Sequence, residues 1–306
     1  MTYELINTDC LQWLAECPPD TFHACITDPP YGLIEYTPEQ LTKRRNGRGG
    51  VWRIPPSFDG SNRQPLPRFT VLTDDDLQKL SGFFSEWANL LLPTLVPGAH
   101  VFIASNPLVS HVVWASMTVA GFEKRGEIIR LVRTFRGGDR PKGAEEEFRE
   151  VSAMPRSAFE PWGLFRKPFE GTLADNLREW GTGGLRRPNA EAPFTDVIPS
   201  GRTSQEEREI APHPSLKPQK FLRQLVWAAL PLGKGTILDP FAGSGSTLAA
   251  AESLGIDSVG IESDEEFFAV ARQAVPKLAR ILNRHDANGD STPFTSMQII
   301  ASNRLS

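Results

Sequence analysis

A short turn near the start of the chain carries the side chains best suited to chemistry. Apolar residues 24–26 lead into Asp28, Pro29, Pro30 and Tyr31, so Asp28 is predicted to stand at the carboxyl end of a buried strand. Because neither proline has an N–H, the turn offers a carboxylate and carbonyl oxygens but almost no donors. It could accept both hydrogens of an amine conjugated to a ring, and Tyr31 could stack on that ring. The alternative is an ordinary turn with an exposed tyrosine.

A glycine-rich turn later in the chain is a second candidate site. A predicted strand ends at Asp239, a turn with Gly243 and Gly245 follows, and the next strand ends at Glu262. A dinucleotide fingerprint would need a third glycine, and a phosphate-binding P-loop would need a lysine. A sulfonium cofactor needs glycines beside its amino-acid part, an acid for its ammonium and an acid for its ribose. Asp239, the glycines and Glu262 meet these needs.

The elements that position these turns alternate between strands and helices. This alternation predicts an α/β fold, Rossmann-like and doubly wound, with a mostly parallel sheet. Asp9 is expected to cap a first helix, and residues 73–76 a second helix that ends at Pro93. The remaining expected elements are strands at 4–7, 99–104, 127–133 and 258–261, and helices at 108–120, 248–254 and from 264 towards 281.

Two stretches break this pattern. Residues 34–70 lose periodicity and include Lys43, Arg44, Arg45 and Arg48, which favours a loop that clamps phosphates over a solvated insert. Residues 135–212 mix aromatic side chains with nearly balanced charge, which fits a region that recognises a target or a packing subdomain. The tail, residues 285–306, is polar and is expected to be weakly ordered.

Composition narrows the class of protein. The 306 residues suit one large domain with an insertion, and the net charge of −4 argues mildly against nucleic acid, although basic residues concentrate locally. Cys10, Cys17 and Cys25 have no metal-binding spacing and no disulfide framework, so no metal is predicted. No apolar run approaches eighteen residues and no signal peptide is apparent, so a cytoplasmic protein without membrane association is expected.

Three motifs in one order resemble a known family. The turn at 28–31, the segment His213-Pro214-Ser215-Leu216-Lys217-Pro218 and the loop 239–246 are similar to those of bacterial and phage DNA amino-methyltransferases. In the resembling group the catalytic half precedes the half that binds S-adenosylmethionine. The resemblance implies a catalytic half at 1–134 with a DNA-contacting insert at 34–70, a target-recognition region at 135–212 and a cofactor half at 213–284.

The resemblance also assigns roles to residues. It implies that Asp28, Pro29, Pro30 and Tyr31 are catalytic. The implied cofactor-binding residues are Asp9, Asp28, His213, Ser215, Lys217, Asp239, Phe241, Ala242, Gly243, Ser244, Gly245, Ser246, Glu262 and Ser263. Simpler roles remain open, since Asp9 could only cap a helix and His213 could only pack. Family members often carry a tryptophan where this chain reads Ile-Ile-Arg-Leu at 128–131, so the side chain that contacts the base there is not identified.

The expected reaction is methyl transfer from S-adenosylmethionine to the exocyclic amine of a base flipped out of double-stranded DNA. In the resembling group an aspartate at the first position of the turn accompanies adenine N6 more often than cytosine N4, so the resemblance implies adenine N6, with cytosine N4 as the alternative. A protein glutamine or an RNA amine is a further alternative, although the glutamine enzymes carry asparagine at the first position of the turn. A homodimer and a cognate restriction endonuclease are compatible partners. The recognition sequence cannot be read from the chain.

Overall fold

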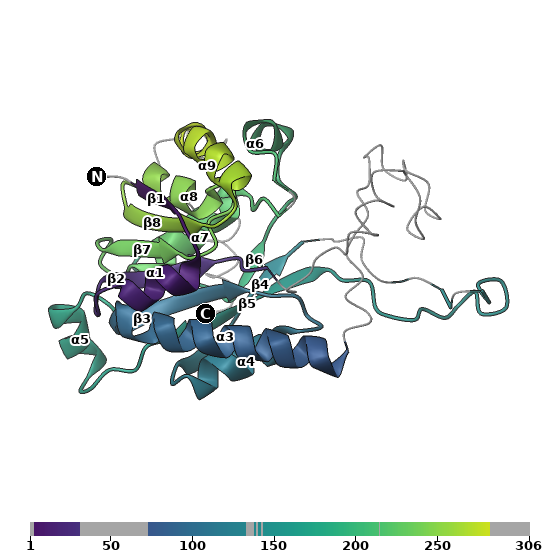
Figure 1. Ribbon diagram of the computed structural model, residues 1–306, viewed down its shortest axis with the longest axis horizontal. Coiled ribbons are helices and arrows are strands. Elements are labelled where there is room, and N and C mark those ends of the chain that lie inside the picture. Colours follow the sequence, from purple (N-terminus) through teal and green to yellow (C-terminus); the bar gives the residue numbers. More distant parts are fainter. Residues whose placement is uncertain are drawn as a thin grey trace.

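The computed structural model describes residues 3–30, 73–132, 138, 140–141, 143–213 and 215–281. Within this part, a central sheet of eight strands has the order β1-β8-β7-β2-β3-β5-β4-β6 (Figure 1). The strands are β1 (Tyr3–Asn7), β2 (Phe22–Thr27), β3 (Leu95–Ala104), β4 (Glu123–Leu131), β5 (Phe159–Arg166), β6 (Val197–Pro199), β7 (Thr236–Asp239) and β8 (Asp257–Glu262). The helices are α1 (Cys10–Glu16), α3 (Asp74–Thr94), α4 (Ser110–Val119), α5 (Leu173–Glu179), α6 (Gln205–Ile210), α7 (Gln219–Ala229), α8 (Ser246–Ser253) and α9 (Glu265–Leu278).

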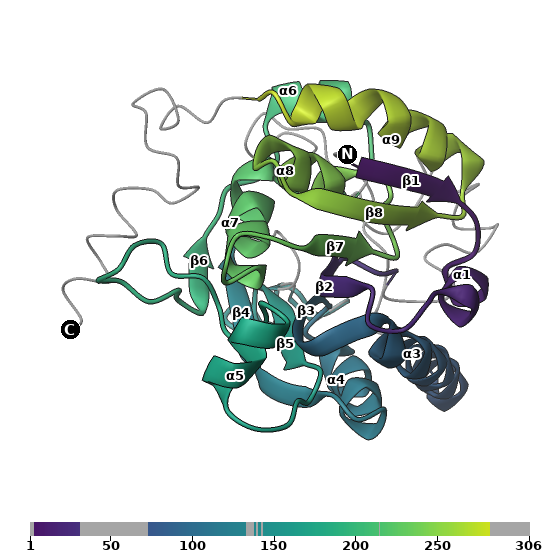
Figure 2. The ribbon, with the colours of Figure 1, turned by 90° about the vertical axis from the view of Figure 1, so that its left-hand side faces the viewer.

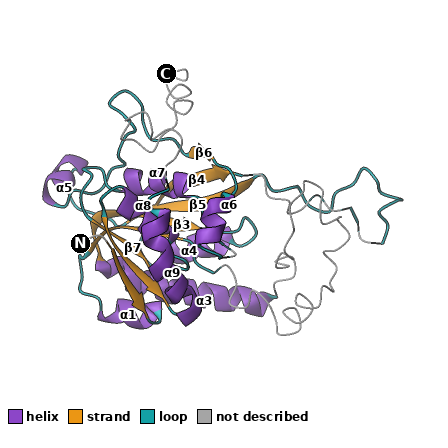
Figure 3. Ribbon diagram, turned by 90° about the horizontal axis from the view of Figure 1, so that it is seen from above, coloured by secondary structure: helices purple, strands orange, loops and turns teal. Residues whose placement is uncertain are grey.

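Helices cover both faces of the sheet. On one face α1, α3 and α4 pack against the strands, and Phe84, Trp87 and Leu91 of α3 are fully buried there. On the other face lie α7, α8 and α9, which Figures 2 and 3 show gathered over the strands. Burial of each large apolar side chain contributes roughly 1.5–3 kcal/mol, which explains why these amphipathic helices form. The predicted doubly wound, mostly parallel fold is confirmed.

Strand β5 departs from the parallel order. It pairs antiparallel with both β3 and β4, whereas β1, β8, β7, β2 and β3 run parallel to one another. The sequence pattern predicted no strand between 135 and 212, because Pro161 and Gly163 are poor strand formers and charged residues stand at both ends. Hydrogen bonding to β3 on one side and β4 on the other makes this segment a strand. The same region also contributes β6, which forms an edge of the sheet.

Local signals place the other elements close to their expected positions. Asp9 caps α1, and Thr73 with Asp76 forms a capping box at the start of α3. Pro93 lies in the last turn of α3, which ends at Thr94 instead of at the proline. None of the helices in the described ranges combines the length and hydropathy that a membrane crossing requires.

The order of the strands reverses between β7 and β2. These strands are paired neighbours, with Ala24 opposite Ile237 and Cys25 opposite Leu238. From β2 the chain passes to α3 on one face, and from β7 it passes to α8 on the opposite face. Open α/β sheets bind ligands in the crevice at the carboxyl ends of strands at such a switch point. Asp28 and Asp239 stand at these two ends.

Candidate active site

Asp28 lies where the sequence predicted, directly after β2. The strand is buried from Ala24 to Thr27, and Pro29 and Pro30 follow Asp28 without regular structure. The Thr27 hydroxyl donates a hydrogen bond of 2.7 Å to Asp239 Oδ1, which ties the ends of β2 and β7 together. Tyr31 and the predicted DNA-contacting residues Lys43, Arg44, Arg45 and Arg48 lie outside the described residues.

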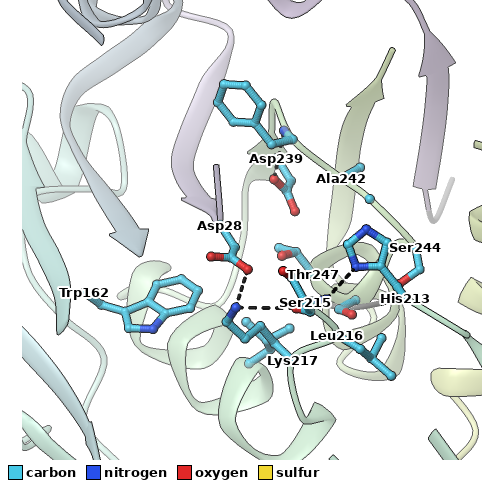
Figure 4. Close-up of a pocket in the computed structure, with 14 residues that line it drawn as sticks. Asp28, Trp162, His213, Ser215, Leu216, Lys217, Asp239, Ala242, Ser244 and Thr247 are labelled. Atoms are coloured by element: carbon cyan, nitrogen blue, oxygen red, sulfur yellow. Dashed lines mark hydrogen bonds and ion pairs between the residues drawn. The ribbon is translucent and has the colours of Figure 1, made fainter. Parts of the chain in front are cut away.

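A pocket at this edge of the sheet joins four segments that are distant in the sequence, one of them β5 through Trp162 (Figure 4). Its lining consists of Asp28, Trp162, His213, Ser215, Leu216, Lys217, Leu222, Asp239, Phe241, Ala242, Gly243, Ser244, Ser246 and Thr247. The turn after β2, the segment before α7 and the glycine-rich loop after β7 therefore meet, as the motifs suggested. Their individual roles in binding a ligand stay predictions.

Several predicted site residues do not line this pocket. Pro29, Pro30, Gly245 and Ser263 are among them, and so are two acids with other partners. Asp9 Oδ1 accepts the N–H groups of Leu11 and Gln12 at 2.9 and 3.1 Å, so the simpler role as a helix cap is observed. A contact between Asp9 and a cofactor stays a prediction.

Glu262 supports the glycine-rich loop. Its Oε2 accepts the Gly243 N–H at 2.7 Å, and its Oε1 accepts the Asp264 N–H at 2.8 Å. Burial raises the pKa of Glu262, and the backbone donors partly offset that effect. Glu262 stands at the carboxyl end of β8. Its hydrogen bond with the Gly243 N–H fixes the carboxylate beside the loop that is predicted to bind the ligand.

Gly243 and Gly245 are each required in the loop for a different structural reason. Both adopt left-handed backbone, with φ of 53° at Gly243 and 81° at Gly245. A Cβ on Gly243 would lie 3.2 Å from His213 Nε2, within the pocket, whereas a Cβ on Gly245 would overlap Val275 of α9. Gly243 therefore keeps space beside His213, and Gly245 allows α9 to pack closely.

Burial dominates the electrostatics of the pocket. It raises the pKa of Asp239 to about 6, although hydrogen bonds from Thr27, Thr247 and the Phe241 N–H oppose this rise. Burial and the nearby Lys217 lower the pKa of His213 to about 4, so the imidazole is neutral near pH 7. His213 Nδ1 accepts the Ser215 N–H at 3.1 Å, and the ring contacts Phe267 edge-on at 4.4 Å between centroids.

Lys217 connects the catalytic turn with β5. Its ammonium forms a close ion pair with Asp28 Oδ2 and lies 3.6 Å from Glu160 Oε1. The sequence placed Lys217 with the cofactor and gave no role to Glu160. It also did not single out Trp162, which stands opposite Ile128 of β4. A tryptophan therefore stands on the strand next to the segment where family members often carry one, and the spacing of Glu160 and Trp162 on one strand face was the available signal.

A doubly wound sheet whose switch point carries an acid–proline–proline turn and a glycine-rich loop defines an amino-methyltransferase. The family model for DNA methylases of the N6 and N4 type matches residues 22–273. The chain therefore belongs to the N6/N4 DNA methylase family. This result confirms the predicted family and, with it, S-adenosylmethionine as the predicted cofactor.

Comparison with individual proteins agrees with the family. The type II methyltransferase M2.DpnII of Streptococcus pneumoniae is 36% identical over 269 residues, which cover 88% of each chain. Two solved structures share the fold at low identity. The M1.HpyAVI complex with S-adenosylmethionine has a TM-score of 0.55 at 16% identity, covering 91% of this chain and 100% of that chain. The cytosine-N4-specific PvuII DNA methyltransferase has a TM-score of 0.58 at 12% identity, covering 95% and 92%.

Proposed function

We propose that the protein transfers a methyl group from S-adenosylmethionine to the N6 amine of adenine in duplex DNA. One observation carries this proposal. The Asp28 carboxylate faces the same pocket as the glycine-rich loop, and the two prolines after it provide no N–H donors. The site therefore presents acceptors to an amine beside a loop suited to the cofactor.

The residues around the pocket fit the cofactor. Buried Asp239 is suited to pair with an ammonium, and the absence of a side chain at Gly243 allows a ligand to approach the backbone beside His213. His213, Ser215 and Lys217 line the same pocket, and the resemblance makes them the candidates to cap the methionine end of the cofactor. Bound S-adenosylmethionine supplies an electrophilic methyl group on a sulfonium. Glu262, at the end of β8, is the candidate acceptor for ribose hydroxyls.

Asp28 acts on the amine by hydrogen bonding. Its carboxylate and the Pro29 carbonyl would accept the amine hydrogens, localise the nitrogen lone pair and stabilise the positive charge that develops on nitrogen. Such an amine is inaccessible inside the base stack, so the base must leave the duplex. Tyr31 is the candidate stacking residue from the sequence, and the Trp162 ring is a second aromatic surface at the pocket.

The choice of adenine rests on the first residue of the turn. A carboxylate at position 28 favours adenine N6, and cytosine N4 is the alternative because both amines have the same chemistry. The cytosine specificity of the PvuII enzyme belongs to that protein, and a likeness at 12% identity concerns the fold. Membership of a DNA methylase family makes an RNA amine and a protein glutamine the weaker alternatives. A homodimer and a cognate endonuclease stay predictions.

Nucleoside analysis tests this proposal. Unmethylated DNA is incubated with the protein and labelled S-adenosylmethionine, digested to nucleosides and analysed by mass spectrometry. We expect labelled N6-methyldeoxyadenosine. We also expect Asp28→Ala to abolish the product while its cofactor affinity, measured by calorimetry, stays within about tenfold of wild type. A digest with only methylated deoxycytidine would make the choice of base wrong, and label confined to RNA or protein would overturn the DNA substrate.

A further inference from the structure

We infer that Glu160 is a positioning residue for methyl transfer, because it shares the Lys217 ammonium with Asp28 and so leaves the Asp28 carboxylate able to act on the amine. This inference rests on the proposed function. Glu160 lies on β5, inside the region that the sequence assigned to target recognition. No motif of the sequence analysis includes it.

Lys217 stands between two carboxylates. Its Nζ forms the ion pair with Asp28 Oδ2 and donates to the Ser215 carbonyl at 3.4 Å (Figure 4). The same Nζ lies 3.6 Å from Glu160 Oε1. The ammonium donates hydrogen bonds to Asp28 and to the Ser215 carbonyl, and it interacts with Glu160 through charge at 3.6 Å. The position of Glu160 therefore influences how completely Lys217 neutralises Asp28.

Glu160 itself accepts hydrogen bonds from two side chains. Arg130 Nη1 donates to its Oε2 at 2.9 Å, and the Trp162 indole N–H donates to its Oε1 at 3.0 Å. Arg130 in turn donates to Ser200 Oγ and to the Gly201 carbonyl, each at 3.0 Å. These contacts fix the carboxylate with its Oε1 towards Lys217, so the arrangement is more than a surface ion pair.

Burial makes these charges interact strongly. The exposed fractions of the side chains are 6% for Arg130, 19% for Glu160, 10% for Lys217 and 15% for Asp28. Charges shielded from water interact several times more strongly than exposed ones. Burial alone raises the pKa of Glu160, but Lys217 and Arg130 together bring it below its usual value, so Glu160 is ionised.

The charges alternate in sign along the series from Arg130 through Glu160 and Lys217 to Asp28. With all of them ionised their sum is zero. Without Glu160 the same series carries one excess positive charge, and Lys217 is compensated by Asp28 alone. An excess positive charge opposes the positive charge that develops on the amine nitrogen, so loss of Glu160 should slow the chemical step without removing any group that binds the cofactor.

The test is Glu160→Gln in the full-length protein, assayed for methyl transfer to DNA. We expect kcat to fall about tenfold, with the KM for S-adenosylmethionine within about twofold of wild type. The acidic limb of the pH profile of kcat should move to lower pH, because removal of a negative charge beside Lys217 favours the ionised forms of the pocket carboxylates Asp28 and Asp239. The other charged or titratable groups around the pocket, Arg130, His213, Lys217 and Glu262, are unchanged.

Glu123→Gln is the matched control. Glu123 and Arg166 form an ion pair between the same two strands, β4 and β5, with nitrogen–oxygen distances of 2.9 and 2.6 Å, at the opposite end of the strand pair. Its removal should leave kcat and the pH profile near wild type. If Glu160 is only structural, both variants should change thermal stability, and neither should move the acidic limb.

A double variant covers the case in which Glu160→Gln folds poorly with Arg130 unpaired. Arg130→Gln with Glu160→Gln returns the sum of the remaining charges to zero, so the acidic limb should return towards wild type. An unmoved limb in the single variant, or a double variant displaced further than the single one, would overturn the inference. Failure of the proposed function is distinct, because the wild-type protein would then label no DNA base.

Discussion

Asp239 shows how burial dominates the ionisation of a single residue of the pocket. Its side chain is 3% exposed, and this desolvation raises its pKa to about 6 despite the hydroxyl and backbone donors around it. A raised pKa means that the folded protein disfavours the charged form. Without a ligand, ionisation of Asp239 therefore lowers the free energy of unfolding as the pH rises through about 6.

The same residue predicts a pH dependence of cofactor binding. The ammonium of S-adenosylmethionine attracts only the ionised form of Asp239. Affinity should therefore fall as the pH drops below about 6, approaching about tenfold per pH unit. His213 stays neutral until about pH 4 and does not contribute in this window. Calorimetry of wild type and Asp239→Asn measures this, and a constant wild-type affinity from about pH 5 to 8 would contradict the assigned role.

At the scale of elements, the pocket depends on how the segment before α7 is anchored to the glycine-rich loop. Glu207 accepts the Gln219 N–H at 2.7 Å and the Ser204 N–H at 2.6 Å, so one buried carboxylate joins the starts of α6 and α7. The Gln219 amide then donates to the Ser246 carbonyl at the start of α8 at 2.9 Å. His213 and residues 215–217 are thereby held against the loop.

Gly243→Ala should disturb this arrangement more than a comparable glycine. The substitution combines left-handed backbone with a Cβ placed 3.2 Å from His213, so the loop or His213 must move and cofactor affinity should fall about tenfold or more. Gly255→Ala is the control, because Gly255 has φ of 67° and open space around its Cβ position. Both variants should lose about 1 kcal/mol of stability. Equal cofactor affinity in the two variants would refute the prediction that the cofactor binds against the backbone at Gly243.

At the scale of the whole molecule, the distribution of charge matters more than its sum. A net charge of −4 disfavours DNA, yet basic residues gather between 36 and 70, immediately after the catalytic turn. Lys43, Arg44, Arg45 and Arg48 lie outside the described residues, and their contact with phosphates stays a prediction from the sequence.

Replacement of these four residues with glutamine tests that prediction. DNA affinity should fall for all sequences alike, and the slope of log affinity against log salt should decrease by about 0.9 for each lost phosphate contact. A variant with Arg178, Lys234, Arg272 and Lys277 replaced changes the net charge equally, and these side chains are exposed in the described part of the chain. The same slope in both variants would argue for a solvated insert without DNA contact.

The sequence by itself determined the features that depend on local interactions. Proline pairs, capping residues and apolar periodicity act over a few residues, so the end of β2 at Asp28, the cap at Asp9 and the start of α3 could be predicted. The order of the motifs along the chain was sufficient to predict the family and the cofactor, because each motif is a short turn with its own chemistry.

The tertiary structure alone decided the features that depend on register between distant strands. Lys217 meets Asp28 across 189 residues, and Glu160 reaches Lys217 only because β5 is inserted between β3 and β4. A slip of one residue in β5 would turn Glu160 and Trp162 to the opposite face of the sheet. No local pattern in the chain encodes that pairing, since Pro161 and Gly163 weaken the strand signal and the neighbouring strands supply the hydrogen bonds that hold it.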